Sequence, residues 1–550
     1  MLKENFVEFI EKSIKENWDN EALADYKGDS LKYKEVANRI TRVHLGFKNA
    51  GIKQGDKIAL IGKNSANWSV VFLATVTYGA VIVPILPDFK PESIHHIVNH
   101  SESIFFFVAE DIYTSLDFNE MPGLRGAFNL NGFSSYDVRE DDLEDMEEKI
   151  ESLFEKKYPK GMKSEDFKAA SVPNSRLAEI SYTSGTTGNS KGVMILHNSL
   201  IANIRFAHNN MPLESGDSIL SFLPLAHAYG CAFEFLFPFT LGCHITFLGK
   251  TPTPQVIIQA FSEIRPRLVL SVPLVIEKIF KKQLLPVISK PSMKILLRIP
   301  GVKNILYKKI RDKLVDVFGS NFHEVVIGGA AFNKEAEDFF KKIKFPFSIG
   351  YGMTECGPLI SYTNWDRTRL RSAGQLVDTL EVKIDSNDPY NEVGEIMVKG
   401  ENVMAGYYKN EEATGAVLDK DGWLRTGDLG VIDREKFIYI RGRSKDMLLG
   451  PSGQNIYPEE IESRINNMTY VLESLVIQEK DRLVALVCPD PESLKRDGMD
   501  DEKLKQVFQE HKKELNRTVP GYMNVTEFRI HPEEFEKTPK KSIKRFLYVK

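Results

Sequence analysis

Residues 182–192, YTSGTTGNSKG, carry the groups that can wrap an anion. The stretch holds three glycines, five Ser or Thr hydroxyls and Lys191. Glycine lets the backbone turn its N–H groups inward, and hydroxyls add donors. The spacing is not that of a Walker A loop, because Gly188 is not followed by Gly-Lys-Ser/Thr at the required offset. A flexible surface loop is the alternative. The donor density, the lysine and the strand-like LAEI before the stretch favour a phosphate-binding loop.

Two further segments offer surfaces that suit a nucleotide base. Tyr351 follows FPFSIG, an expected strand, and a flat aromatic side chain at the carboxyl end of a strand can stack on a base. The alternative is a tyrosine of the core. Gly329 and Ala330 lack bulk, so adenine could lie against their backbone, although by themselves they would indicate only a tight turn.

Three polar residues could contact a ribose, a phosphate or a carboxylate. Asp428 lies in RTGDLG, where its carboxylate could accept both ribose hydroxyls or simply form an Asx turn. Arg443 could reach the same ribose or the α-phosphate, although an isolated arginine more often faces solvent. His227, in PLAH, follows an apolar strand and could be structural.

Together these motifs resemble those of the adenylate-forming superfamily, which includes acyl-CoA synthetases, luciferases and peptide-synthetase adenylation domains. YTSGTTGNSKG looks like the phosphate loop of that family. Further motifs follow in the family's order: PLAH at 224–227, GGA at 328–330, YGMTE at 351–355, TGD at 426–428 and GRSKD at 442–446. SFLPLAHAYG and GENVMAGYYKN are most similar to the long-chain fatty acyl-CoA synthetases.

The resemblance implies a role for each matched residue. It makes Glu355 the metal ligand, Thr354 a phosphate contact and His227 a neighbour of the substrate carboxylate, and Mg²⁺ does prefer hard oxygen ligands shared with substrate phosphates. Thr183 joins these three as a catalytic residue. The implied nucleotide-binding residues are Ser184, Gly185, Thr186, Thr187, Gly188, Lys191, Gly329, Ala330, Tyr351, Gly352, Asp428 and Arg443.

The carboxyl-terminal tail departs from the family pattern T-x-x-G-K-I-x-R. The chain reads Thr538-Pro-Lys-Lys-Ser-Ile-Lys-Arg545, so Ser542 stands where the family has its lysine. Serine is too short to bridge a carboxylate and the α-phosphate. In an extended chain Lys540 and Lys544 share the face of Ser542. The family's glycine is also missing, so a shift of one residue could present Lys541 instead. We predict Lys541 as the catalytic lysine, with Lys540 as the close alternative.

The function implied by the resemblance is an AMP-forming ligase that uses ATP, Mg²⁺ and coenzyme A. It would adenylate a medium- to long-chain fatty acid and pass the acyl group to coenzyme A. The transition state concentrates negative charge, so cations and oriented N–H donors should dominate catalysis. Two alternatives stay open. The acceptor could be the phosphopantetheine thiol of an acyl carrier protein. Alternatively, with serine at 542, the protein could bind ATP or acyl-adenylate without turnover.

The elements that must position these residues form an α/β fold. Apolar strand-like runs alternate with helical patterns, for example KIALIG at 57–62, VIVPIL at 81–86, SIFFFVAE at 103–110, RLVLSV at 267–272 and EVVIGGA at 324–330. Such alternation predicts mixed or parallel sheets flanked by helices. After about residue 376, LVDTLEVKID, GEIMVKG and FIYIRGR predict a small barrel-like β subdomain.

The last hundred residues predict a small α+β domain. YPEEIESRI reads as a helix opened by Pro458, and LESLVIQE and RLVALVCP read as strands. We predict an amino-terminal nucleotide- and acyl-binding domain over 1–443 and a mobile domain over 444–550. In the family the small domain rotates between the two half-reactions, and the resemblance implies that Lys445 is the hinge.

Composition excludes several classes of protein. At 550 residues the chain should hold more than one domain, and 42% hydrophobic with 27% charged residues excludes a disordered or collagen-like chain. A net charge of -4 gives no global positive field for a nucleic acid. Four cysteines without a C-x-x-C pair indicate a reduced compartment. The start of the chain lacks the apolar core of an export signal. We therefore expect a cytoplasmic protein.

Three apolar or basic stretches have two interpretations each. Val70–Leu86 is uncharged but contains glycine and proline, which favours a buried helix ending at Gly79 and then a strand over a membrane span. Lys281–Lys313 is strongly basic with apolar clusters, and could contact the inner face of a membrane peripherally or be a solvated face. CAFEFLFPFTLG at 231–242 could line an acyl pocket or belong to the core; its nearness to His227 favours the pocket wall.

Overall fold

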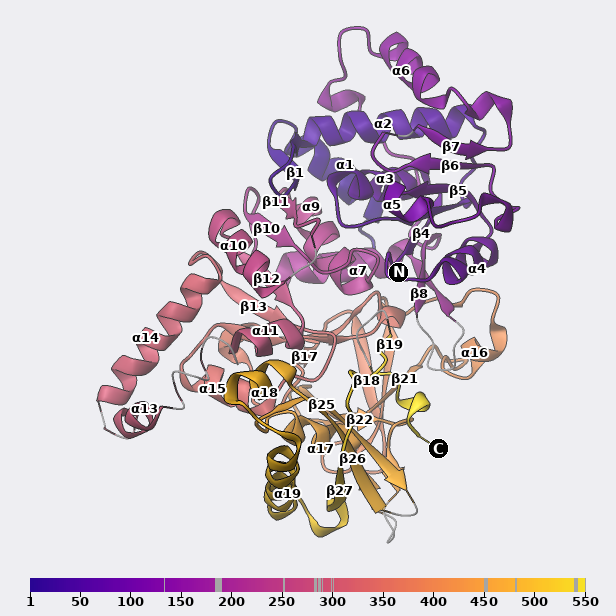
Figure 1. Cartoon of the computed structure of the whole chain (residues 1–550). Helices are drawn as coiled ribbons and strands as arrows, with labels where there is room; N and C mark the ends of the chain where they lie inside the picture. Colours follow the sequence, from indigo (N-terminus) through magenta and orange to yellow (C-terminus); the bar gives the residue numbers. More distant parts are fainter. Residues whose placement is uncertain are drawn as a thin grey trace.

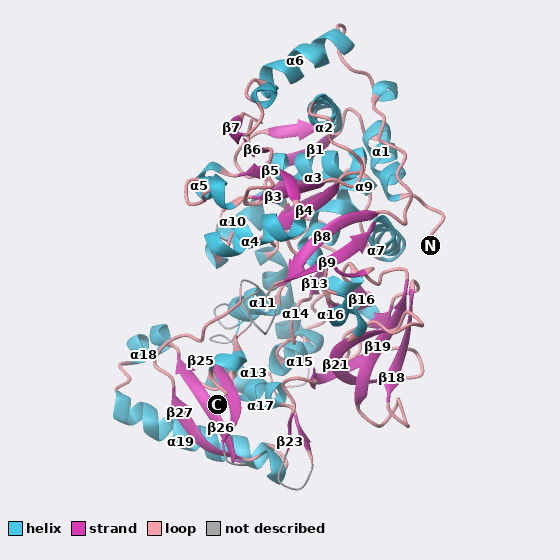
Figure 2. Ribbon diagram, turned by 90° about the vertical axis from the view of Figure 1, so that its right-hand side faces the viewer, coloured by secondary structure: helices cyan, strands magenta, loops and turns pink. Residues whose placement is uncertain are grey.

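The computed structural model describes the chain except for residues 133, 184–189, 251–252, 281–283, 285–287, 289, 298, 300, 450–453, 480–481, 539–542 and 550. Figures 1 and 2 show the first sheets and helix α6 (Met146–Lys157) at one end of the molecule, and the last strands with helix α19 (Asp501–Thr518) at the opposite end.

The largest sheet that the described residues form runs in the order β20-β9-β8-β4-β3-β5-β6-β7. Its five inner strands, from β8 to β6, are parallel, and β9, β20 and β7 pair antiparallel at its two sides. The strands are β3 (Lys57–Ile61), β4 (Val81–Ile85), β5 (Ser103–Val108), β6 (Gly126–Asn129), β7 (Ser135–Val138), β8 (Leu177–Thr183), β9 (Lys191–Leu196) and β20 (Gly406–Tyr407). The predicted strands at 57–62, 81–86 and 103–110 are confirmed.

Helices cover this sheet, and their ends follow from local sequence. Helix α3 begins after Ser65, whose hydroxyl accepts the Trp68 N–H, and ends at Gly79 in the left-handed conformation, as predicted. The uncharged stretch is therefore a buried helix followed by buried strand β4. The first helices are α1 (Phe6–Glu16), α2 (Tyr33–Asn49), α3 (Ala66–Tyr78), α4 (Pro91–Ser101), α5 (Glu110–Tyr113), α6 (Met146–Lys157) and α7 (His197–Asn210).

Two smaller sheets continue the α/β part. One has the order β10-β11-β1-β2, and the other is the parallel sheet β12-β13-β14. Their strands are β1 (Glu21–Asp25), β2 (Ser30–Lys32), β10 (Ser218–Ser221), β11 (His244–Phe247), β12 (Leu268–Ser271), β13 (Glu324–Ile327) and β14 (Phe347–Ile349). The helices in this part of the chain are α8 (Ala228–Gly230), α9 (Phe237–Leu241), α10 (Pro254–Ile264), α11 (Pro273–Ile279), α13 (Pro291–Leu296), α14 (Val302–Val317) and α15 (Lys334–Lys342).

The predicted β subdomain corresponds to two antiparallel sheets, β15-β16-β17 and β18-β19-β21-β22. Their strands are β15 (Tyr351–Gly352), β16 (Leu359–Tyr362), β17 (Gln375–Leu376), β18 (Leu380–Asp385), β19 (Gly394–Gly400), β21 (Leu424–Ile432) and β22 (Ile438–Arg443), and helix α16 spans Glu411–Gly415. A bridge between Gln375 and Phe437 joins the two sheets.

The residues after 443 form strands and helices with buried clusters of their own. Ile461, Ile465 and Phe508 lie in a cluster whose buried members all follow residue 455. The elements are β23 (Leu448–Leu449), β24 (Asn455–Ile456), α17 (Pro458–Ile465), β25 (Val471–Glu479), β26 (Arg482–Pro489), α18 (Pro491–Asp497), α19 (Asp501–Thr518) and β27 (Val525–Ile530). The helix at Pro458 and both predicted strands are confirmed. The domain boundary after residue 443 stays a prediction.

Short 3-10 turns complete the described elements: η1 (Phe118–Glu120), η2 (Asp141–Leu143), η3 (Ser164–Asp166), η6 (Thr354–Cys356), η7 (Trp365–Arg367), η8 (Gly521–Met523) and η9 (Arg545–Leu547). No helix within the described part of the chain combines the length and apolar character that crossing a bilayer requires.

The phenylalanine-rich stretch 231–242, which we predicted to line an acyl pocket, packs into the core instead. CAFEFLFPFTLG forms a π-helix over Cys231–Leu236 followed by α9, and its four phenylalanines are at most 1% exposed. Phe235 packs edge-on against Phe72, with ring centroids 5.8 Å apart. The run therefore belongs to the main core, which was the alternative to a pocket wall.

The close approach of β15 and β16 requires glycine at position 352. A Cβ atom built on Gly352 would lie 2.1 Å from the backbone oxygen of Pro358, which cannot move without shifting the strand. We expect Gly352→Ala to lower the free energy of unfolding by about 1–3 kcal/mol, the usual cost of overpacking. Thermal and denaturant unfolding measure the effect. Gly123→Ala is the control, because a Cβ there meets nothing within 4 Å. Equal stability of both variants would contradict the packing argument.

Candidate functional site

The predicted phosphate loop connects two antiparallel strands of the large sheet. Thr183 at the end of β8 pairs with Lys191 at the start of β9, and the Thr183 hydroxyl donates to the Lys191 carbonyl at 3.5 Å. The turn that they flank includes predicted residues that lie outside the described part of the chain: Ser184, Gly185, Thr186, Thr187 and Gly188.

A chain of three side chains links the base of this loop to the predicted metal ligand. The Lys191 ammonium lies 4.8 Å from the centre of the Tyr407 ring. The Tyr407 hydroxyl donates to Glu355 Oε1 at 2.8 Å. Tyr407 belongs to β20, which pairs with β9 and so brings the GENVMAGYYKN segment beside the loop. Tyr407 was not predicted as a site residue, although it lies inside a quoted motif.

Glu355 fits the chemistry expected of a magnesium ligand. It sits in the turn η6, with Thr354, and its backbone carbonyl accepts the Met404 N–H at 2.8 Å. Its half-buried carboxylate supplies a hard, anionic oxygen that Tyr407 holds in place. Among the described residues, no group of three or more His, Cys, Asp or Glu side chains is placed to hold a metal ion. A magnesium ion here would therefore depend on Glu355 together with substrate phosphates.

A second cluster joins the YGMTE, TGD and GRSKD motifs. The Tyr351 hydroxyl donates to Asp428 Oδ2 at 2.7 Å, and Arg443 Nε lies 3.0 Å from Asp428 Oδ1. Asp428 and Arg443 face each other on the paired strands β21 and β22. The sequence predicted Asp428 and Arg443 for the ribose and Tyr351 for the base, and the structure brings the three side chains together, with Tyr351 buried.

Burial and charge shift the protonation of this cluster in opposing ways. Burial raises the pKa of Asp428, while Arg443 opposes that rise. Burial and the neighbouring carboxylate hold the pKa of Tyr351 well above its usual range, so Tyr351 stays a hydrogen-bond donor. Asp428 raises the pKa of Arg443. Each carboxylate oxygen keeps a second lone pair, so Asp428 can accept ribose hydroxyls while bonded to Tyr351 and Arg443.

The GGA motif and Tyr229, which follows PLAH, meet at the carboxyl end of β13. Gly329 has φ +87°, a conformation that favours glycine, and Gly329 and Ala330 are exposed just beyond the strand. The Tyr229 hydroxyl donates to the Val326 carbonyl at 3.1 Å, and its ring is the nearest neighbour of Gly328. His227 is half-buried two residues before Tyr229. Tyr229 therefore joins the segment after His227 to the strand that leads into GGA.

Helix α4 contributes a cluster that the sequence did not reveal. His100 Nδ1 lies 2.7 Å from the Tyr182 hydroxyl, and the Tyr408 hydroxyl donates to Glu102 at 2.8 Å. Lys409 pairs with the same glutamate at 2.8 Å. Tyr182 and Tyr408 flank β9 from both sides, so this cluster fixes the strands around the loop. The sequence offered one signal for this cluster, since Tyr182 and Tyr408 lie in the quoted motifs YTSGTTGNSKG and GENVMAGYYKN. Their partners on and beside α4 are distant in sequence, so the contacts could not be predicted.

The predicted hinge lies between two ion pairs. Lys445 is exposed in the turn after β22. Arg443, two residues earlier, pairs with Asp428, and Asp446, one residue later, lies 3.7 Å from Arg545. Arg545 also donates to Glu462. The predicted Lys541, its alternative Lys540 and Ser542 lie outside the described residues.

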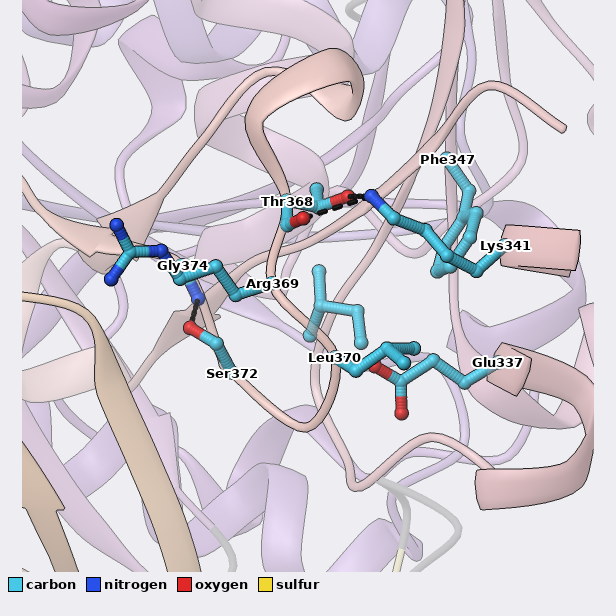
Figure 3. Close-up of a pocket in the computed structure, with 9 residues that line it drawn as sticks. Glu337, Lys341, Phe347, Thr368, Arg369, Leu370, Ser372 and Gly374 are labelled. Carbon is cyan, nitrogen blue, oxygen red and sulfur yellow. Dashed lines mark hydrogen bonds between the residues drawn. The ribbon is translucent and has the colours of Figure 1, made fainter. Parts of the chain in front are cut away.

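A separate hollow, shown in Figure 3, lies beside α15 and the loop that follows β16. Phe347 and Leu370 line it, and Lys341 donates to the Thr368 carbonyl at 2.8 Å at its rim. Its volume is ≈ 10 Å³, which holds about one water molecule. It is far too small for a nucleotide or an acyl chain.

Comparison with known proteins agrees with this geometry. Residues 10–408 match the family described as AMP-binding enzyme. The chain belongs to that family. Membership makes it an adenylate-forming ligase by class.

Curated relatives extend over most of the chain at low identity. The long-chain-fatty-acid–CoA ligase FadD15 of Mycobacterium bovis is 25% identical, over 93% of this chain and 89% of that protein. The chloroplastic long-chain-fatty-acid–[acyl-carrier-protein] ligase AEE15 of Arabidopsis thaliana is 28% identical, over 87% of this chain and 75% of that protein. The family's acyl acceptors therefore differ among relatives of similar identity.

Solved structures confirm the α/β fold with a large amino-terminal and a smaller carboxyl-terminal domain. The anthranilate CoA ligase AuaEII with anthranoyl-AMP has a TM-score of 0.79 at 20% identity, covering 100% of this chain and 97% of that chain. The o-succinylbenzoate CoA synthetase MenE from Bacillus subtilis, with its acyl-adenylate, has a TM-score of 0.74 at 19% identity, covering 100% and 98%. At such identities the likeness establishes the fold.

Replacing Asp428 tests the ribose site. We expect Asp428→Asn to weaken AMP binding by about 10- to 100-fold, because charge-assisted hydrogen bonds contribute more than neutral ones. Titration calorimetry measures the affinity. Asp433→Asn is a matched control, since it also removes a carboxylate paired with an arginine, Arg369. Unchanged AMP affinity in a folded Asp428→Asn variant would remove Asp428 from the ribose site.

Proposed function

We infer that this protein is an AMP-forming ligase that adenylates a medium- to long-chain fatty acid with ATP and transfers the acyl group to coenzyme A. The YGMTE segment carries the proposal. Tyr351 and Glu355 lie four residues apart in this segment. Tyr351 hydrogen-bonds to Asp428, and Glu355 hydrogen-bonds to Tyr407. One short segment thus joins the predicted ribose and phosphate ends of the site. The names of the long-chain relatives support the choice of acid.

Different residues of this chain have separate roles in the first half-reaction, the adenylation of the fatty acid. Asp428 and Arg443 hold the ribose, and Tyr351 orients the Asp428 carboxylate. Lys191, fixed over Tyr407, places a cation beside the phosphates. A magnesium ion held by Glu355 and the phosphates would neutralise charge on the triphosphate. The fatty carboxylate then attacks the α-phosphorus, pyrophosphate leaves, and electrostatic stabilisation by these groups lowers the barrier.

Three finer assignments complete the proposal. Lys541, with Lys540 as the alternative, approaches the carboxylate and α-phosphate in place of the family lysine. Lys445 is the hinge. On one side of it Arg443 pairs with Asp428 in β21, and on the other side Asp446 pairs with Arg545 in the carboxyl-terminal segment. The protein acts in the cytoplasm, an assignment that rests on its few cysteines.

Two other functions are each favoured by one observation. Transfer to the phosphopantetheine thiol of an acyl carrier protein is favoured by the likeness to AEE15, which has that acceptor in its name. Nucleotide binding without turnover is favoured by Ser542 at the position of the family lysine.

A panel of acids and thiols tests the substrate assignment. Fatty acids of increasing length, with acetate and benzoate as controls, are scored for AMP release with coenzyme A or acyl carrier protein as acceptor. We expect long-chain acids to exceed both controls by about tenfold or more in kcat/KM, since each buried methylene contributes to discrimination. We expect coenzyme A to be the better thiol. A preference for benzoate, or turnover with carrier protein alone, would contradict the proposal.

A further inference from the structure

A helical arm projects from the body of the protein. Helices α13 and α14 extend away from the sheets in Figure 1, and we call the described residues 290–297, 299 and 301–313 the basic arm. Residues 307–314 of α14 anchor it, because Ile310 and Leu314 are buried and the Tyr307 ring packs edge-on against Phe339, with ring centroids 6.4 Å apart. The start of α14, before Tyr307, and all of α13 lie beyond this anchor.

The outer part of the basic arm exposes large apolar side chains. Ile295 is 63% exposed and Ile305 is 61% exposed. Leu296 and Ile299, at 38% and 42%, lie between them in sequence. Single exposed apolar residues are ordinary, but four within eleven residues on a projecting tip mark an interaction surface.

The same arm is basic on its exposed surface. Lysines at five described positions are exposed: Lys290, Lys303, Lys308, Lys309 and Lys313. Arg311 is paired with Asp312 at 2.9 Å, so it adds little net charge. Lysine can lay its apolar stem along a hydrocarbon surface while its ammonium stays at the polar boundary. Exposed isoleucines among lysines on a helix are typical of an interfacial element that meets anionic lipid.

We propose that the basic arm docks on an anionic lipid surface. Ile295, Leu296, Ile299 and Ile305 insert at the boundary of the acyl chains, and the lysines bind headgroup phosphates. A second copy of the chain is a poorer occupant, since two such arms would bring like charges together. An acidic protein would match the charge of the lysines, but it would also need an apolar pocket to bury the exposed side chains of the projecting tip.

Docking has a consequence that rests on the proposed function. A long-chain fatty acid partitions strongly into bilayers because each buried methylene favours the apolar phase by about 0.8 kcal/mol. An arm that holds the enzyme on the bilayer places it where that substrate is concentrated.

Vesicle co-sedimentation tests the proposal with the full-length protein and no ATP. We expect binding to vesicles of phosphatidylglycerol and phosphatidylcholine at low salt, and little binding to phosphatidylcholine alone. The triple variant Lys303→Glu, Lys308→Glu, Lys309→Glu should lose at least about tenfold in affinity, given the contribution of each basic residue near an anionic surface. The double variant Ile295→Ser, Ile305→Ser should also bind more weakly. Higher salt should reduce wild-type binding.

A matched triple variant on α19 controls for net charge. Lys503, Lys505 and Lys513 are similarly exposed, and reversing them changes the total charge equally. This control should bind like wild type. The idea fails if wild type does not bind at low salt, if neutral vesicles bind as well, or if the α19 variant loses as much. It also fails if the isoleucine variant converts a dimer to a monomer without affecting vesicle binding.

Turnover of fatty acid in detergent distinguishes the docking proposal from the proposed ligase function. With fatty acid dispersed in detergent, the arm variants should keep wild-type turnover, because no arm residue belongs to the nucleotide site. A protein that binds vesicles but adenylates no acid would overturn the function and leave the docking surface intact. Loss of turnover in detergent in a folded arm variant would overturn the assignment of the arm to docking alone.

Discussion

The buried carboxylate of Asp428 is the constraint around which the nucleotide site is built. A carboxylate that is 4% exposed is costly unless charged or hydrogen-bonding groups surround it. Tyr351 and Arg443 meet that need, so β15 must lie against the paired strands β21 and β22. Because β15 directly follows β14, the same contact sets Tyr351 beside the carboxyl end of the parallel sheet, where GGA ends the neighbouring strand.

A second constraint comes from the edge of the largest sheet. Strand β20 pairs with β9 and thereby places Tyr407 between Lys191 and Glu355. Glu355 is also close enough to raise the pKa of Asp428. The ribose and phosphate ends of the site are thus electrostatically coupled, and bound phosphates would meet cationic and anionic groups already fixed by backbone pairing.

Local sequence predicted what depends on short-range geometry. The left-handed Gly79 at the end of α3, Pro458 in the first turn of α17 and the strand before Tyr351 all follow from residue types within a few positions. The contact between Tyr407 and Glu355 spans 52 residues, and that between His100 and Tyr182 spans 82. Neither contact leaves a periodic signal in the sequence, because each joins segments that only the folded sheet and its covering helices bring together. The phenylalanine run after His227 was misjudged for the same reason, since its helical packing against Phe72 is a tertiary property.

Fatty-acid-dependent exchange of labelled pyrophosphate into ATP tests the account most directly, because it needs the adenylation site and no thiol. The account predicts exchange with a long-chain acid, and a loss on the order of 100-fold or more in Glu355→Gln, which keeps the hydrogen bond from Tyr407 but removes the anionic oxygen. A folded protein that binds AMP yet exchanges with no fatty acid, or a Glu355→Gln variant that exchanges like wild type, would contradict it.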